Sequence, residues 1–160
     1  MSEQHIQIAA ERCASESYRQ MRVRQQQEVN GFPMAFAFSD RQFAEGMRAL
    51  GLDPSDTGQV LSIGGGGFIR KTDAEAFHAM FRRHRLERKA AMDADRTGDR
   101  YLLEMFRCEL SDHEYGYTRD AEPALMALGV SWEEIGSDER LRYAFETACL
   151  QEADWYDHNQ

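Results

Sequence analysis

No apolar run in this sequence is long enough to cross a membrane, and cysteine is scarce. A spanning helix needs about 18 or more apolar residues in succession, and no stretch of the chain approaches that length. The opening residues, MSEQHIQIAAERCASES, also lack the basic segment followed by an apolar segment that marks a secretory signal. These absences predict a protein that does not contact a membrane and stays in the cytoplasm.

The three cysteines, Cys13, Cys108 and Cys149, lie far apart and form no CxxC pair. An odd number without close spacing argues against both a zinc ribbon and a disulfide framework. Each cysteine falls within a helical pattern, so we expect each to be a small buried apolar side chain. The leading prediction therefore includes no bound metal and no other cofactor.

The composition is that of one folded, acidic domain. A chain of 160 residues suits a single domain, and 42% apolar residues are enough to build a core. Within residues 1–160 we expect an N-terminal helix over 1–29, a core over 30–156 and a frayed tail over 157–160.

Charge is distributed unevenly along the chain. Residues 1–69 carry a net charge of −2 and residues 70–107 a net charge of +3. Residues 108–160 contain 3 basic and 13 acidic groups, a net charge of −10 against −9 for the whole chain. Such a surface repels nucleic acid and attracts basic partners, so direct binding to nucleic acid is not expected.

The periodicity of apolar residues predicts an α+β fold that is mostly helical, with about five helices and a small antiparallel sheet of about three strands. The longest helices are expected over residues 3–29, 73–94 and 138–154. The strands are expected over residues 34–38, 59–63 and 68–71.

A run of four glycines occurs in SIGGGGFIRKTD, residues 62–73. A phosphate-binding loop needs G-x-x-x-x-G-K-[ST] between a strand and a helix, but the register from Gly65 puts Arg70 where the second glycine belongs. Two strand-like segments flank the glycines, so a hairpin turn fits better. The run exceeds what a turn needs, which leaves room for a close backbone approach by another element of the chain or by a partner, and the candidate partner contacts here are Gly65, Gly66 and Phe68.

The segment ELSDHEYGYTRD is the richest polar cluster in the chain. If the preceding helix extends this far, Glu109 and His113 stand one turn apart, and with Glu114 and Asp120 they could bind a metal or act as an acid–base pair. The alternative is structural: His113 would meet the negative end of a helix dipole.

Within residues 82–89, the segment FRRHRLERK contains four arginines and one lysine. One interpretation pairs this basic helix with the acidic C-terminal third, either within one chain or across a homodimer.

Three phrases, FAFSDRQFAEGMRALGL, SIGGGGFIRKTD and FRCELSDHEYGYTRDAEPALMALGVSWEEI, resemble a family of small proteins that bacteriophages and mobile elements encode, known only as a domain of unknown function. The resemblance spans roughly residues 30–145. It implies a phage setting within a host cell and brings no assigned catalytic residues.

The acidic surface and this resemblance together predict a protein-binding module. The expected partner is a host protein with a basic surface, of the kind that binds nucleic acid, and the expected effect is antagonism of a defence system, as CRISPR inhibitors achieve. The candidate contacts on the acidic third are Glu133, Glu134, Asp138 and Glu139. The alternatives are a small enzyme centred on the Glu109 cluster and a structural or regulatory phage component.

Overall fold

The computed structural model describes residues 16–159, and it confirms a mostly helical α+β fold with one three-stranded antiparallel sheet. The described residues form eight α-helices rather than about five. These are α2 (Tyr18–Asn30), α3 (Asp40–Ala49), α4 (Ala74–Ala94), α5 (Tyr101–Asp112), α6 (Tyr115–Thr118), α7 (Glu122–Leu128), α8 (Trp132–Ser137) and α9 (Glu139–His158). The strands are β1 (Ala35–Phe36), β2 (Val60–Gly64) and β3 (Gly67–Arg70).

The prediction of about five helices was too low, partly because α6 and α8 have only four and six residues. Neither is long enough to show a clear apolar period. The helix α8 is fixed instead by a capping box, in which the Ser131 side chain accepts from the Glu134 amide and the Glu134 side chain accepts from the Ser131 amide. The helix α6 is held by its packing against α9, which local sequence patterns do not show.

The chain divides into two compact units, Met1–Arg24 with Leu86–Gln160, and Gln25–Arg85. The division falls within α2 and within α4. It does not test the expectation of a single domain, which stays a prediction. Residues 3–15 of the expected N-terminal helix lie outside the described part of the chain.

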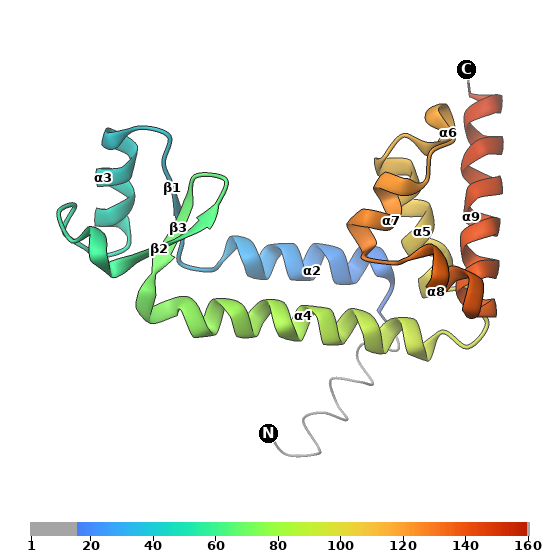
Figure 1. Ribbon diagram of the computed structural model, residues 1–160, viewed down its shortest axis with the longest axis horizontal. Helices are drawn as coiled ribbons and strands as arrows, with labels where there is room; N and C mark the ends of the chain where they lie inside the picture. The colour runs from blue at the N-terminus through green and yellow to red at the C-terminus, as the bar shows by residue number, and fades with distance from the viewer. Residues whose placement is uncertain (1–15, 160) are drawn as a thin grey trace, which may run out of the picture. The chain divides into compact units, whose positions relative to one another are not determined.

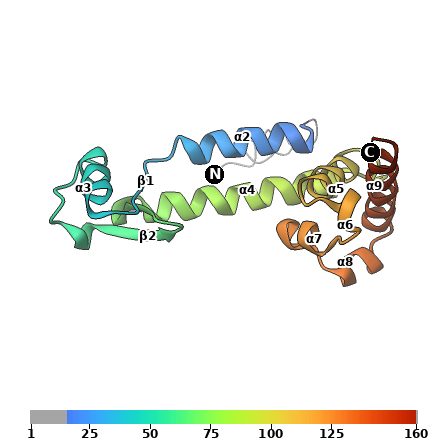
Figure 2. The same cartoon turned by 90° about the horizontal axis from the view of Figure 1, so that it is seen from above.

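In the unit Gln25–Arg85, the sheet has the order β1-β3-β2, with β3 antiparallel to both neighbours. The helix α3 lies beside this sheet (Figure 2) and packs on it through a small core of Met47, Leu50 and Phe68. The strand β1 is shorter than predicted because the amide of Phe38 donates to the Gln42 side chain at 2.7 Å instead of to the sheet. Ser39 then caps α3.

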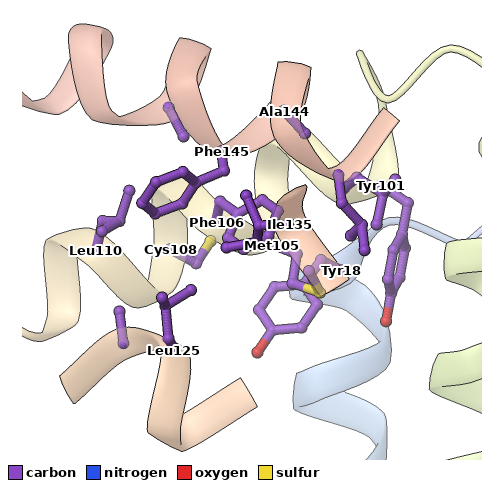
Figure 3. Packing of buried hydrophobic residues seen from close by; sticks show 14 of the residues in the cluster. Tyr18, Tyr101, Met105, Phe106, Cys108, Leu110, Leu125, Ile135, Ala144 and Phe145 are labelled. Carbon is purple, nitrogen blue, oxygen red and sulfur yellow. The ribbon is translucent and has the colours of Figure 1, made fainter. Parts of the chain in front are cut away.

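In the other unit, α5 and α9 pack against each other, α6 packs against both, α7 packs against α5 and α8 packs against α9 (Figure 1). The core between them is apolar and aromatic (Figure 3): Phe106 and Leu110 of α5 are fully buried, and the rings of Phe106 and Phe145 lie 5.5 Å apart. Tyr18 and Met21 of α2 belong to the same core. The helix α9 ends at His158, four residues beyond the predicted end.

None of the helices within residues 16–159 is both long enough and apolar enough to span a bilayer.

Candidate functional site

The glycine run forms the turn of the β2–β3 hairpin, as the flanking strands predict. Gly64 faces Gly67 across the hairpin, and φ is +86° at Gly64, +58° at Gly65 and +77° at Gly66. Positive φ at both central residues is what a two-residue hairpin turn requires. The glycines therefore join two antiparallel strands rather than a strand and a helix, so the geometry of a phosphate-binding loop is not present here.

The length of the glycine run also has a structural cause. A Cβ atom on Gly66 would lie 2.7 Å from the Phe38 ring and 3.0 Å from the Ala37 carbonyl oxygen. The close approach at Gly66 is therefore made by the Phe38 ring and the Ala37 backbone of the same chain.

The aromatic residues beside this turn differ in exposure. Phe68, predicted to contact a partner, is only 5% exposed and packs in the small core with Met47 and Leu50. Phe36 and Phe38 are 55% and 79% exposed, so they are the aromatic side chains beside the turn that face solvent. Sequence reasoning missed them because MAFAF has the composition of a buried strand.

The polar cluster centres on Glu109, which is 7% exposed. Its Oε2 lies 3.6 Å from Nε2 of His113, one helical turn away, as the spacing predicts. Its Oε1 accepts a 2.6 Å hydrogen bond from the Tyr18 hydroxyl and lies 3.4 Å from the Arg22 guanidinium. Burial of the ring, first, and then the bond to Glu109 raise the pKa of the Tyr18 hydroxyl far above its usual value. The carboxylate is therefore occupied by groups of its own fold.

The other two members of the predicted cluster have different surroundings. Glu114 is exposed at the start of α6, and Asp120 accepts a 3.0 Å hydrogen bond from the Glu122 amide at the start of α7. Across residues 16–159, no three His, Cys, Asp or Glu side chains are arranged to hold a metal ion. The arrangement thus offers a helix-end histidine and caps rather than a shared centre.

Two of the predicted contacts in the acidic third are helix caps. The Ser131 backbone amide donates to the Glu134 side chain and lowers the pKa of that carboxyl group. Asp138 caps α9 by accepting from the amides of Arg140 and Leu141, and the Arg140 guanidinium at 3.0 Å is the main cause of its lowered pKa. Charge reversal at Glu134 or Asp138 would therefore disturb folding as well as any contact with a partner.

Glu133 and Glu139, the other two predicted contacts, are exposed. Glu139 belongs to a larger feature on α9. A helix turns by about 100° per residue, so residues spaced by three or four share a face. One exposed face carries, in this order, Glu139, Tyr143, Glu146, Leu150, Asp154 and Asp157. We call these six residues the α9 stripe.

The α9 stripe combines four carboxylates with two large apolar side chains, of which Tyr143 is 50% exposed and Leu150 72% exposed. Its C-terminal end is partly neutralised, because Asp157 pairs with Arg119 at 2.7 Å and Asp154 lies 3.3 Å from His158. The remaining two carboxylates of the stripe, Glu139 and Glu146, are exposed and lie away from these contacts, so they are the best placed to meet a partner. The α9 stripe was not predicted from the sequence, although its six residues recur at the helical period within residues 139–158.

The basic helix is already partly neutralised by local acids. Within α4, Arg82 pairs with Glu75 and Lys89 pairs with Asp93, both at 2.7 Å. Arg83 contacts Glu28 of α2, whose second oxygen lies 2.7 Å from Nε2 of His84. Hydrogen bonding to His84, first, and then to Arg83 lowers the pKa of the Glu28 carboxyl group. These pairs reduce the positive charge that the segment presents.

The cysteines divide by burial. Cys108 is buried, as predicted, and its Sγ accepts a 3.1 Å hydrogen bond from Nε of Arg19. Cys149 is half-buried, and burial raises the pKa of its thiol, which makes it a poor nucleophile at neutral pH. Cys13 lies outside the described residues.

The chain belongs to a family of unknown function, DUF7659, which it matches over residues 17–151. The match includes α2 and therefore begins earlier than the resemblance over residues 30–145 suggested. A search of the curated proteins found no significant match. A search of the solved structures found none either.

Proposed function

We propose that the protein is an acidic protein-binding module and that the α9 stripe is its main docking surface. The single observation that carries this proposal is the composition of that stripe, which places four carboxylates and two exposed large apolar residues on one face of a 20-residue helix. Within the described chain, this face of α9 is exposed to solvent.

The chemistry of the stripe favours a partner with a basic surface. Exposed carboxylates attract Lys and Arg over a distance of about 8 Å at physiological ionic strength, and Tyr143 and Leu150 supply apolar area that gains free energy only when it is covered. Carboxylates and phosphates both accept paired hydrogen bonds from the arginine fork. A groove that grips nucleic acid is therefore a suitable partner, and the module would compete with the nucleic acid for it.

We further propose that the partner belongs to a host defence system that binds nucleic acid. The protein would block that system in the cytoplasm of the host cell, as a CRISPR inhibitor does. The support for this proposal is the resemblance of three sequence segments to phage-encoded proteins, together with the net charge of −10 over residues 108–160. Competition for a basic groove is the simplest way for such a surface to block a nucleic-acid-binding protein.

A second copy of the chain is another partner that the charge distribution allows. Sedimentation at low and high salt distinguishes the two cases, because a homodimer held by opposite charges dissociates as salt rises and a module for a foreign basic partner sediments as a monomer throughout.

The alternative of a small enzyme centred on Glu109, His113, Glu114 and Asp120 has less support. An acid–base role would require the Glu109 carboxylate to reach a substrate, whereas the Tyr18 hydroxyl and the Arg22 guanidinium already contact it.

The experiment is a comparative pull-down from a lysate of the bacterial host, using the full chain and two charge-matched variants. The stripe variant carries Glu139→Lys and Glu146→Lys. The control variant carries Glu45→Lys and Asp56→Lys, which change the net charge equally at exposed positions outside α9.

Proteins that bind the wild type and the control but not the stripe variant support the proposal if they bind nucleic acid through a basic surface. The same proteins captured equally by all three forms would exclude the stripe as the docking surface. Capture lost in both variants would show that net charge alone drives the binding.

A further inference from the structure

A cavity of about 430 Å³ opens between the α5–α6 corner and the C-terminal end of α9. The cavity and the α9 stripe lie on different faces of α9, because the residues of α9 that line the cavity are Glu152, Trp155 and Tyr156. The other side is formed by Ser111, Glu114, Gly116 and Tyr117.

Close packing of α6 on α9 shapes this cavity. A Cβ atom on Gly116 would lie 2.8 Å from Cβ of Tyr156 and 3.2 Å from the Glu152 carbonyl oxygen, so only glycine allows the two helices to approach this closely. At the ends of α6, Glu114 and Arg119 adopt φ of +59° and +60°, a left-handed conformation that is strained for a non-glycine residue. Glycine or asparagine would be less strained at both positions, yet the sequence has a charged residue at each.

Three aromatic rings line the cavity. Tyr117 is 72% exposed and Trp155 is 59% exposed, and the rings of Tyr117 and Tyr156 lie 6.1 Å apart at 55°. Exposed aromatic faces carry negative potential and attract organic cations. Tyr and Trp side chains have only two torsions each, so ordering them around a ligand costs little conformational entropy.

Two carboxylates add negative charge to the aromatic lining. Glu152 is 7% exposed, and its Oε1 accepts a 3.1 Å hydrogen bond from Nε of Arg107. Glu114 has no hydrogen bond or ion pair from its carboxylate to any residue among 16–159. The Arg107 contact neutralises much of the charge of Glu152, so Glu114 is the carboxylate that remains for a ligand.

We propose that this cavity binds the guanidinium group of an arginine side chain presented by a partner protein. A guanidinium is planar and stacks on aromatic rings, and its N–H groups form a fork that matches a carboxylate. The ammonium of lysine is a compact, strongly hydrated charge that gains less from stacking. The identity of the ligand as a partner's arginine rests on the proposed function, whereas binding of a guanidinium group does not.

The test uses blocked arginine, Nα-acetyl-arginine amide, as the probe and the full chain as the receptor. The chain has two tryptophans, so Trp132→Phe leaves Trp155 as the only indole, and its Nε1–H signal reports binding by NMR. We expect a saturable shift with a dissociation constant in the millimolar range. Blocked citrulline, which has the same shape without the charge, is expected to give no saturable shift.

Two substitutions at exposed positions test the residues assigned to the site. Glu114→Gln and Tyr117→Leu should each weaken binding of blocked arginine about two- to fivefold, as expected for an exposed ion pair and an exposed cation–π contact. Far-UV circular dichroism establishes that each variant is folded. The proposal is overturned if blocked citrulline or blocked lysine binds as tightly as blocked arginine, or if neither substitution changes the affinity.

The outcome is separable from that of the proposed function. The blocked amino acid needs no partner protein, and the stripe variant, Glu139→Lys with Glu146→Lys, leaves the cavity residues unchanged. Normal binding of blocked arginine by a protein whose stripe captures nothing would sustain this site and remove the docking role of the stripe.

Discussion

The Tyr18 hydroxyl donates a 2.6 Å hydrogen bond to Oε1 of Glu109, and both residues are buried. The two positions are 91 residues apart in the sequence, and the bond ties α2 to α5 within one compact unit. Glu109 also lies near Arg22 and His113. A carboxylate with this many partners from its own chain stabilises the fold and is poorly placed for acid–base chemistry.

Removing the hydroxyl tests that interpretation. Tyr18→Phe keeps the ring in the core but leaves the buried Glu109 carboxylate without its shortest hydrogen bond. We expect a loss of about 1.5 to 3 kcal/mol in the free energy of unfolding, the range for hydrogen bonds to charged groups. Urea denaturation measures it. Tyr143→Phe, at a half-exposed position, is the control and should change stability by less than about 0.5 kcal/mol.

An unchanged unfolding midpoint in Tyr18→Phe would show that water or another group satisfies Glu109, and it would reopen the cluster to a functional role.

The sequence was a good guide where local chemistry decides the structure. The glycine run predicted the hairpin because positive φ is a property of the residue itself. Glu109 and His113 were placed together by the helical period alone. The contact of Glu109 with Tyr18 could not be predicted, because nothing in either segment specifies which distant helix packs on it.

The hairpin glycines offer a graded prediction. Gly65 and Gly66 both have positive φ, but the space around Gly65 is open, whereas a Cβ on Gly66 would meet Phe38 and the Ala37 carbonyl oxygen. Gly65→Ala should cost about 1 to 2 kcal/mol from backbone strain alone, and Gly66→Ala should cost more. Thermal denaturation of both variants compares them directly. Equal costs would mean that both the Phe38 ring and the Ala37 carbonyl group move aside without penalty.

The same hairpin predicts that nucleoside triphosphates do not bind at the glycines. A ligand at 100 times its dissociation constant stabilises a protein by about 2.7 kcal/mol, so excess ATP with magnesium would raise the melting temperature if the run bound phosphate. We expect no shift. An increase that disappears in Lys71→Ala would contradict the assignment of this segment as a turn.

The two capping carboxylates predict how stability depends on pH. The pKa values of Glu134 and Asp138 are lowered in the folded protein, so their contribution is fully present above the unfolded pKa of about 4 and is lost as pH falls through the folded values. The melting temperature should therefore decline below about pH 4. In the double variant Glu134→Gln with Asp138→Asn, stability should be lower at neutral pH and its decline in acid should be smaller.

A decline of the same size in that double variant, measured by calorimetry at several pH values, would mean that other carboxylates control the acid sensitivity.

The candidate site was harder to predict than the fold, for a physical reason. Negative charge in residues 108–160 is visible from composition, but the role of each carboxylate depends on its neighbours. Glu134 and Asp138 are caps, while Glu146 faces solvent. Likewise, Phe68 and Phe38 are alike in sequence, but Phe68 lies in β3 and packs in the small core, whereas Phe38 lies beyond the end of β1 and is exposed.

The most direct test of the central claim, docking through the α9 stripe, is the association rate with a captured partner at two salt concentrations. Electrostatic steering accelerates association and weakens as salt screens it. We predict that Glu139→Lys with Glu146→Lys slows association at low salt more than it speeds dissociation, whereas Glu45→Lys with Asp56→Lys has a smaller effect on either rate. An association rate that is insensitive both to salt and to the stripe substitutions would contradict the claim, and the hairpin residues Phe36 and Phe38 would then be the surface to test.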